Sequence, residues 1–320
     1  MNQDWQTILF YIIVLGFMLL TFFVVRRLLQ TKKKLDHVTA SLETSEKYKE
    51  SCFFEYEGQN LYYEFSKNTL AEECIVFIHG IGASSYSFRF MDDYFKDSYS
   101  ILKLDLLGFG KSSKDPKIDL SAAFHAKVIN ALIEDLKIKK PILVGSSMGG
   151  AISLYLAKFY PNSFSKVIAM TPAIALKRLR FFHLATFQGL AKGIGTRLVN
   201  REFIRRQLNN VMNDKSKITE EVIDRYYEPY HQDVDAMLCL LHSAQLMRDQ
   251  NSWNELKEVS AKVLLLWGEN DKVTPIRHKF RFHKHFPDWQ IKVHPEAGHH
   301  IHEDDPEWVA QSILKFIKSQ

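Results

Sequence analysis

The chain of 320 residues is 46% hydrophobic and 25% charged, which excludes a disordered chain and fits one large α/β domain with an insertion, or two small domains. The formal net charge of +5 is mild, and its excess Lys and Arg residues gather in two places, which favours a membrane surface over nucleic acid as a partner. The three cysteines, Cys52, Cys74 and Cys239, have no metal-ligand or redox spacing, so they exclude a disulfide framework and fit a reducing compartment.

The first element is an apolar stretch without a charged residue, from Ile8 to Val25. With the residues up to position 29 it reaches about 30 Å, the thickness of a bilayer core, at about 1.5 Å per residue. No basic residue precedes it and no small-x-small cleavage site follows, so a transmembrane helix over residues 8–29, after a short tail at 1–7, is favoured over a signal peptide. Basic residues at its end and just after it predict that the rest of the chain is cytoplasmic, by the positive-inside rule.

Residues 30–50 form a polar stretch rich in helix-forming residues, which predicts a solvated helical linker. Leucines at heptad spacing leave a short coiled coil open as an alternative. The first part of the core, residues 51–172, begins with two strands at Phe53–Tyr56 and Leu61–Phe65. With the turn at 57–60 they predict an antiparallel hairpin.

Strands and helices alternate after the hairpin. A strand is predicted where a continuous apolar run ends in a loop of small residues, and a helix where apolar residues recur with a period of about 3.6. The predicted strands are Cys74–Ile78, Ile101–Asp105, Ile142–Val144, Lys166–Met170, Ala261–Trp267 and Trp289–His294. The predicted helices are Ser121–Leu136, one after Gly150, one after Pro275 and Asp305–Ile317. This alternation predicts an α/β fold, with a mostly parallel sheet and helices on both faces.

One serine, Ser147, lies in a strand–turn–helix pattern at Ile142–Gly150. In a Gly-x-Ser-x-Gly turn of this kind, the strained backbone lifts the serine Oγ above the end of the sheet. Gly145 and Gly149 are expected because a Cβ at either position would collide with the neighbouring strand or helix. A nucleophilic serine also needs a base and a group that orients the base, and without them the pattern is only a tight turn.

The alternation stops after residue 172, and residues 173–259 show several helical patterns and no convincing strand. They predict a helical lid inserted before the second part of the core, residues 260–320. The beginning of the lid is rich in aromatic and basic residues, which leaves two interpretations open: it lies on an anionic bilayer surface, or its apolar side packs on the core. Either one leaves an apolar cavity above the serine, with Phe181 and Phe182 as predicted substrate contacts.

The base and the orienting acid are predicted at the ends of the last two strands. If the strands follow one another across the sheet in chain order, their carboxyl ends share one edge with Ser147, where ligands bind. Asp271 follows one strand, and His299 follows Ala297-Gly298 after the other. The rivals are His300 and His302 for the base and Glu269 for the acid. The histidine cluster does not predict a metal site, because no complementary ligand motif occurs elsewhere.

The oxyanion hole is predicted from two backbone N–H groups, those of Met148 after the serine and of Ile81 after the first core strand. Gly80 and Gly82 in the same loop are predicted to leave room for substrate. These groups predict two-step acyl transfer: Ser147 attacks an ester carbonyl, the alcohol leaves, and water hydrolyses the acyl-enzyme. No metal or organic cofactor is needed.

Five motifs, in this order, resemble those of the α/β-hydrolase superfamily over nearly all of residues 53–320. They are His79-Gly80-x-Gly82, Asp105-x-x-Gly108-x-Gly110-x-Ser112, Gly145-x-Ser147-Met148-Gly149-Gly150, Trp267-Gly268-Glu269-x-Asp271-x-x-x-Pro275 and Ala297-Gly298-His299. An N-terminal span before such a core resembles the membrane-anchored monoacylglycerol lipase and esterase branch. That resemblance implies a serine hydrolase of carboxylic esters, expected to be lipid esters such as monoacylglycerols. A carbon–carbon bond hydrolase, a perhydrolase and a non-catalytic membrane-anchored binding protein are the alternatives, and the oligomeric state is open.

Overall fold

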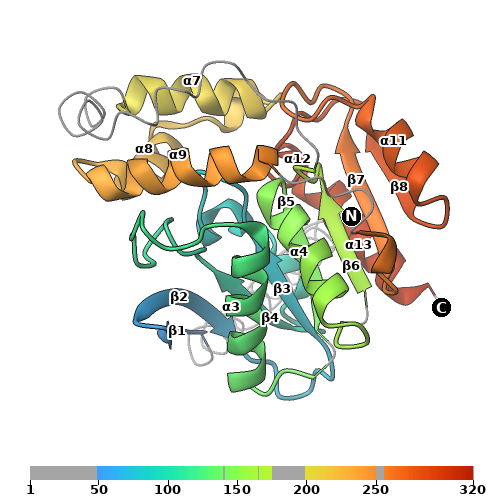
Figure 1. Cartoon of the computed structure of the whole chain (residues 1–320). Helices are drawn as coiled ribbons and strands as arrows, with labels where there is room; N and C mark the ends of the chain where they lie inside the picture. Colours follow the sequence, from blue (N-terminus) through green and yellow to red (C-terminus); the bar gives the residue numbers. More distant parts are fainter. Residues whose placement is uncertain (1–48, 140, 165, 175–198, 250–255, 320) are drawn as a thin grey trace, which may run out of the picture. The chain divides into compact units, whose positions relative to one another are not determined.

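The computed structural model describes residues 49–139, 141–164, 166–174, 199–249 and 256–319 (Figure 1). The chain divides into two compact units, residues 1–49 and 50–320, and the fold described below is that of the second unit. The predicted transmembrane helix at 8–29 lies outside the described residues. Among the helices that are described, none combines the length and the apolar character that a membrane span requires.

The core is an eight-stranded sheet with strand order β1-β2-β4-β3-β5-β6-β7-β8. The strands are β1 (Lys49–Tyr56), β2 (Gln59–Ser66), β3 (Cys74–Ile78), β4 (Ser100–Leu104), β5 (Ile142–Ser146), β6 (Lys166–Met170), β7 (Lys262–Gly268) and β8 (Gln290–His294). All pairings from β4 through β8 are parallel, and β2 joins β4 antiparallel. The predicted mostly parallel sheet is confirmed.

The expectation that the strands follow chain order is wrong at one place. Strand β4 lies between β2 and β3, whereas chain order would place it between β3 and β5. The chain leaves β3 toward one side, forms β4, and returns through a helix to place β5 on the other side of β3. Adjacent strands whose connections run in opposite directions open a crevice at their carboxyl ends, where ligands bind in sheets of this kind. The loop after β3 and the turn after β5 lie at the carboxyl ends of these two adjacent strands.

The hairpin of β1 and β2 closes with a two-residue turn, shorter than the predicted one at 57–60. Both turn residues, Glu57 (φ 50°) and Gly58 (φ 77°), are left-handed, which matches the twist of the flanking strands in a type I′ turn. β1 begins at Lys49, two residues inside the stretch that was predicted as a helical linker.

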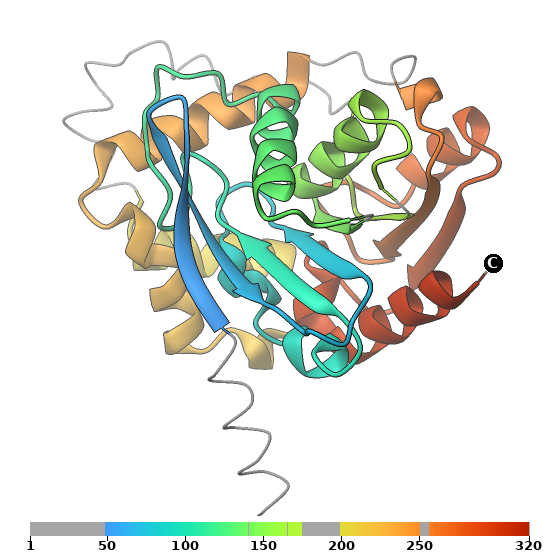
Figure 2. The same cartoon turned by 90° about the horizontal axis from the view of Figure 1, so that it is seen from below.

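Helices cover both faces of the sheet, and Figure 2 shows α3 and α4 on one face and α13 on the other. The helices of the core are α2 (Asp92–Phe95), α3 (Ala122–Asp135), α4 (Met148–Phe159), α11 (His278–His285), α12 (Ile301–Asp304) and α13 (Pro306–Lys318). In β3, Val76 and Ile78 pack with α3 and α4, while Ile75 and Phe77 pack with α2 and α13. Alternate side chains of each central strand therefore enter two different cores, as a sheet covered on both faces requires.

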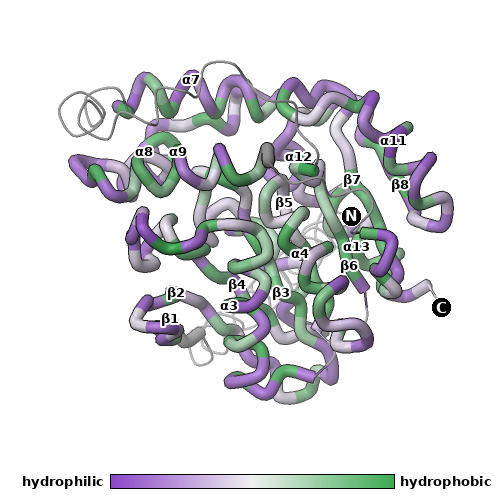
Figure 3. Tube along the Cα trace, viewed as in Figure 1, coloured by the Kyte–Doolittle hydropathy of each residue, from purple (hydrophilic) through white to green (hydrophobic). Residues whose placement is uncertain are grey.

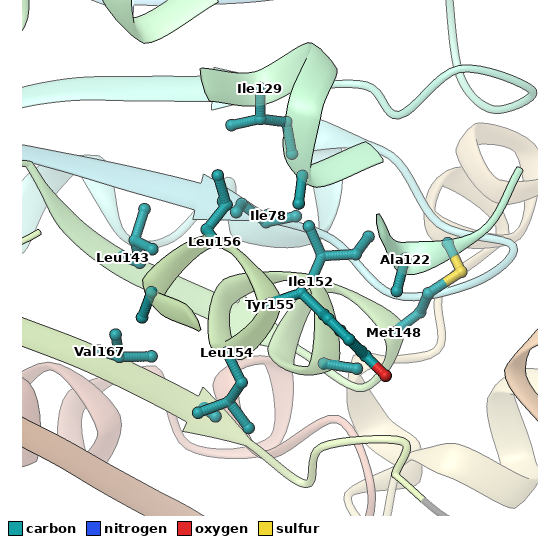
Figure 4. Packing of buried hydrophobic residues seen from close by; sticks show 14 of the residues in the cluster. Ile78, Ala122, Ile129, Leu143, Met148, Ile152, Leu154, Tyr155, Leu156 and Val167 are labelled. Atoms are coloured by element: carbon teal, nitrogen blue, oxygen red, sulfur yellow. The ribbon is translucent and has the colours of Figure 1, made fainter. Parts of the chain in front are cut away.

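Figure 4 shows the first of these cores from close by, with Ile152 and Leu156 of α4 between the sheet and Ile129 of α3. The central strands are strongly apolar, and Figure 3 shows polar residues concentrated on the outer sides of the helices and on the hairpin. This packing fixes α4, and so fixes the turn that leads into it from β5.

Between β6 and β7 the described residues form helices and turns, and we call residues 199–249 the lid. Its main elements are α7 (Arg201–Val211), α8 (Glu220–Tyr227), a short 3₁₀ segment η5 (Glu228–Tyr230) and α9 (Val234–Asp249). Helices α7 and α8 are capped by Asn200 and Thr219, whose side chains accept a backbone N–H of the first turn. Side chains of the lid pack on Gly82 and Gly108, in the loops after β3 and β4, so the lid covers the carboxyl edge of the sheet.

Candidate active site

Ser147 stands in the sharp turn between β5 and α4. Its backbone has φ 53° and ψ −113°, a left-handed conformation that a residue with a side chain rarely adopts. The turn is held by its own backbone: the Ser147 N–H donates to Met170 (2.9 Å), and its carbonyl accepts from Ala151 (3.1 Å) and Ala173 (3.0 Å). Strain maintained by the surrounding structure in this way is typical of functional sites.

The two glycines that flank the serine are needed for the reason expected from the sequence. A Cβ on Gly145 would stand 2.1 Å from the carbonyl oxygen of Gly149, inside the turn itself. A Cβ on Gly149 would stand 2.0 Å from the carbonyl oxygen of Ile78 in β3. Helix α4 can therefore approach the sheet closely enough to present Ser147 only because both positions lack a side chain.

Asp271 and His299, at the ends of β7 and β8, are brought into direct contact. Nδ1 of His299 lies 2.8 Å from Oδ2 of Asp271, and the residues are 3% and 5% exposed, respectively. Oδ1 of Asp271 accepts the N–H groups of Val273 (2.8 Å) and Thr274 (2.9 Å), while Oδ2 also accepts the Thr274 hydroxyl (2.6 Å). This set of donors is arranged for a carboxylate.

Burial by itself raises the pKa of Asp271, but the hydrogen bonds from His299 and Thr274 outweigh it and hold that pKa below its ordinary value. Asp271 is therefore ionised at neutral pH and accepts the Nδ1 proton of His299. The proton on Nδ1 leaves Nε2 of the neutral ring free to accept a proton. This is the tautomer that a general base beside a serine requires.

Ser147 and His299 reach the same edge from two sides of the end of β6. The Ser147 N–H donates to the last residue of β6, and the hydroxyl of the next residue, Thr171, donates to the His299 carbonyl (3.2 Å). Among the described residues, no hydrogen bond joins the Ser147 hydroxyl to His299. In hydrolases without substrate such bonds are often long and tighten in the complex. The structure thus joins the acid to the base directly and places the serine at the same edge.

The rivals of His299 and Asp271 have other surroundings. His302 is buried and stacked on Phe88 (4.8 Å between ring centres), and burial lowers its pKa to about 3. His300 directs Nδ1 at Glu303 (3.0 Å), and Glu269 is exposed. Neither histidine contacts Asp271 among the described residues.

The loop after β3 is held by His79, which is fully buried. Its Nε2 accepts the Leu106 N–H (2.9 Å), so Nδ1 carries the proton and donates to the Gly80 carbonyl (2.7 Å). Burial lowers the pKa of His79, which keeps the ring neutral in this role. The side chain of Asp105 holds the next segment in place by accepting the N–H groups of Ser85 (2.7 Å) and Lys111 (2.8 Å).

The predicted oxyanion donors lie on this loop and on the serine turn. A Cβ on Gly80 would stand 3.1 Å from the Ser147 Cβ, so the loop passes directly beside the serine. In the part of the chain that is described, neither the Ile81 N–H nor the Met148 N–H is taken by another hydrogen bond. Both groups remain available to an oxygen atom near Ser147, as an oxyanion hole requires.

Two residues of the site were not found from the sequence. Thr274 supplies a hydroxyl and an N–H to Asp271, and its position three residues after an aspartate, in a turn, was a usable signal. Tyr230 of the lid places its hydroxyl 3.9 Å from where a Cβ on Gly82 would stand, buried and without a partner among the described residues. No sequence signal pointed to Tyr230, because its place depends on how the lid packs. The predicted substrate contacts Phe181 and Phe182 lie outside the described residues.

Comparisons with known proteins bear on the family and the fold. A family model described as alpha/beta hydrolase fold matches residues 73–306. The uncharacterized hydrolase YugF of Bacillus subtilis is 33% identical over 275 residues, covering 83% of this chain and 97% of that protein. A 2-hydroxy-6-oxononadienedioate/2-hydroxy-6-oxononatrienedioate hydrolase of Comamonas testosteroni is 28% identical over 235 residues, covering 71% and 81%. An esterase of Exiguobacterium antarcticum has a similar structure, with a TM-score of 0.71 at 21% identity, covering 84% and 100%.

Proposed function

The chain belongs to the α/β-hydrolase family, and from that premise we propose that it is a serine hydrolase that cleaves carboxylic esters, with lipid esters such as monoacylglycerols as its substrates. The observation that carries the proposal is the buried contact between Asp271 and His299, at the sheet edge where the turn at Ser147 is strained. A purely structural aspartate and histidine have no need to meet beside a strained serine.

The proposed mechanism uses each group at the atom that the geometry makes available. Nε2 of His299 takes the proton of the Ser147 hydroxyl as Oγ attacks the ester carbonyl. Asp271 holds the imidazole in the productive tautomer and stabilises the imidazolium that forms. The N–H groups of Ile81 and Met148 stabilise the oxyanion. His299 then protonates the leaving alcohol. Water attacks the acyl-enzyme in place of the serine, with His299 again acting first as base and then as acid, and Ser147 is released.

Three features support a substrate with an apolar acyl chain. Leu240 of α9 stands over Gly82, where a Cβ would lie 3.6 Å from it, so an apolar lid side chain faces the oxyanion loop. Ala83, directly after that loop, packs in an apolar cluster with residues of α7, α8 and α9. The third feature is the aromatic-rich beginning of the predicted insertion at 173–259, known from its sequence alone.

The N-terminal stretch extends the proposal to location. We place residues 8–29 in a membrane as a single span with the hydrolase domain on the cytoplasmic side, on the basis of apolar length and flanking charge. Removal of residues 1–48 is then expected to release an active enzyme from membranes. In sealed vesicles of known orientation, protease must digest the hydrolase domain from the cytoplasmic face alone; digestion from the opposite face reverses the orientation.

A second candidate is a hydrolase of carbon–carbon bonds. It is favoured by one observation, a 28% identical relative that is named as a hydrolase of 2-hydroxy-6-oxo acids. The same serine, base and oxyanion donors serve that reaction, because it also begins with addition to a carbonyl group. The two candidates differ in the substrate and in the bond that is cleaved, so activity measurements separate them.

The deciding experiment compares kcat/KM over p-nitrophenyl esters from acetate to palmitate, monoacylglycerols, and 2-hydroxy-6-oxo-6-phenylhexa-2,4-dienoate. A rise with acyl length and cleavage of monoacylglycerols supports the lipid esterase. A preference for acetate removes the lipid substrate but keeps the esterase. Efficient cleavage of the dienoate, with esters slower by about 100-fold or more, overturns ester hydrolysis in favour of the second candidate.

A further inference from the structure

Three consecutive acids, Glu303, Asp304 and Asp305, follow His299 along the chain, and the structure gives them different partners. Asp304 ends α12, which lies beside the lid helices in Figure 1. Its side chain is buried, although none of its carboxylate contacts is with a cationic side chain in the described residues. The partners of the Asp304 carboxylate are backbone N–H groups from two parts of the chain that are far apart from each other in the sequence.

One of these groups is the N–H of Gly298, which donates to Oδ2 of Asp304 at 2.6 Å. Gly298 directly precedes His299, so this bond fixes the backbone that carries the base. The other groups belong to the residues after α7 of the lid: the N–H groups of Asn213 and Asp214 donate to Oδ1, both at 2.9 Å. A single carboxylate therefore ties the loop of His299 to the lid.

The two segments also touch each other directly. The N–H of His300 donates to the carbonyl of Val211, the last residue of α7, at 2.9 Å. A Cβ on Gly298 would stand 2.7 Å from the same carbonyl oxygen, so the lid backbone lies against the loop as closely as a glycine permits. The lid segment is thus held against the loop that follows β8 and carries His299.

Glu303 makes a second connection, and it is fully buried. Its carboxylate accepts the hydroxyl of Tyr226 in α8 of the lid (2.5 Å), a guanidinium N–H of Arg89 (2.5 Å) and Nδ1 of His300 (3.0 Å). Burial alone raises the pKa of Glu303, but the His300 hydrogen bond and the nearby charge of Arg89 lower it to about 2, so the group is ionised. The Glu303 carboxylate therefore holds both the imidazole of His300, which follows the base in the chain, and helix α8 of the lid.

Asp305 has none of these connections. It begins α13 by accepting the Trp308 N–H (3.0 Å), and it contacts Nε2 of His294 (3.0 Å) in β8. Both hydrogen-bond partners belong to the core, and among the described residues Asp305 makes no hydrogen bond to the lid, although the charge of Lys217 acts on it. It provides a control within the same three residues.

From these contacts we propose that Glu303 and Asp304 are positioning residues, which hold the loop of His299 against the lid so that the base keeps its geometry only when the lid is in place. The inference rests on the proposed function, because it concerns the base of that reaction. Without the Asp304 carboxylate, three backbone N–H groups lose their acceptor and the loop gains freedom. A displacement of about 1 Å at a catalytic group lowers the rate about 100-fold.

The test compares Asp304→Asn and Glu303→Gln with Asp305→Asn, using kcat and KM for p-nitrophenyl butyrate and urea unfolding. We expect kcat to fall about 10- to 100-fold in the first two variants while KM changes little, because the base is misplaced and binding is not. Asp305→Asn is expected to lower stability and to keep kcat within about threefold. Equal loss of stability in all three variants with kcat retained overturns the inference.

A milder pair covers the case in which Asp304→Asn does not fold. Tyr226→Phe removes a single hydroxyl, the lid's donor to Glu303. Its control Tyr227→Phe removes a hydroxyl whose hydrogen bond, among the described residues, is with the exposed His231 alone. A fall in kcat of about fivefold or more for the first variant alone supports the inference, and equal values overturn it.

A last measurement separates this inference from the proposed function. If wild-type protein cleaves no ester and takes up no fluorophosphonate, the proposed function has failed, and amide hydrogen exchange then judges the connection on its own. In Asp304→Ala, which removes both acceptor oxygens, the amides at positions 213, 214 and 298 must lose protection together. Loss at 298 with protection kept at 213 and 214 overturns the connection.

Discussion

The Asp271→Asn substitution tests how the acid orients the base, and the structure determines which way the new amide points. Oδ1 of Asp271 accepts the N–H groups of Val273 (2.8 Å) and Thr274 (2.9 Å). An amide NH₂ at that position would face two donors, so the asparagine oxygen must take it. The NH₂ group then occupies the position of Oδ2, which lies 2.8 Å from Nδ1 of His299.

This orientation inverts the tautomer of the base. Nδ1 of His299 has to accept from the NH₂ group, so the ring proton moves to Nε2, the nitrogen that should take the proton of Ser147. In serine proteases the same substitution lowers kcat about 10,000-fold by this route. We expect a loss of that order, about 5.5 kcal/mol in activation free energy. The cost in folding is small, because the asparagine keeps the shape and both backbone hydrogen bonds of Asp271.

The assay is kcat for p-nitrophenyl butyrate, with circular dichroism and thermal unfolding to show that each variant is folded. Glu269→Gln is the matched control, because Glu269 is an exposed acid two residues away, and its variant is expected to keep the wild-type kcat. A folded Asp271→Asn protein whose kcat lies within about threefold of wild type would refute the orientation argument.

Three other substitutions test the turn, the acid and the buried anion. Gly149→Ala places a Cβ 2.0 Å from a carbonyl oxygen of β3 and is expected to cost about 3 kcal/mol of unfolding free energy or more, against about 1 kcal/mol for Gly58→Ala in its open turn; urea unfolding measures both. Thr274→Val removes the hydroxyl donor to Asp271 (2.6 Å) and should lower kcat about tenfold with little change in KM, so an unchanged kcat counts against it. Burial raises the pKa of Glu303, but its hydrogen-bonded histidine, His300, and the nearby charge of Arg89 bring that pKa from 4.5 to about 2. The ionised carboxylate therefore stabilises the fold by about 3 kcal/mol above pH 4.5, and this stabilisation is lost as the pH falls toward 2. The difference in unfolding free energy between wild type and Glu303→Gln must therefore shrink over that range; a constant difference would contradict the assignment.

Local pattern was enough to predict most of the core. The strands at 74–78 and 166–170 have the predicted bounds, because a continuous apolar run between polar loops has few other places in a folded chain. The helix predicted at 121–136 runs from 122 to 135, and the structure shows Ser121 as its N-terminal cap. Gly145 and Gly149 were predicted from the same local geometry and are explained by contacts shorter than 3 Å.

The order of the strands could not be obtained in this way. No feature of the residues at 100–104 indicates that this strand lies between β2 and β3, because its apolar run would fit equally well on either side of β3. The contacts of Asp304 were also beyond local reach, because Asn213 and Asp214 lie about 90 positions earlier in the chain. Such pairings are decided by the packing of the lid, for which the sequence provides helical periodicity but no register.

We expect Ser147 to be a nucleophile activated by His299, and covalent labelling can detect this reactivity without knowledge of the substrate. Wild-type protein treated with a fluorophosphonate is analysed by intact mass and peptide mapping, beside Ser147→Ala, His299→Ala and Ser146→Ala, the last of which replaces the adjacent buried serine of β5. The account predicts a single adduct on Ser147 in wild type and in Ser146→Ala, none in Ser147→Ala, and labelling slowed by about 1,000-fold or more in His299→Ala. An unlabelled wild type, or an adduct that persists in Ser147→Ala, would contradict it.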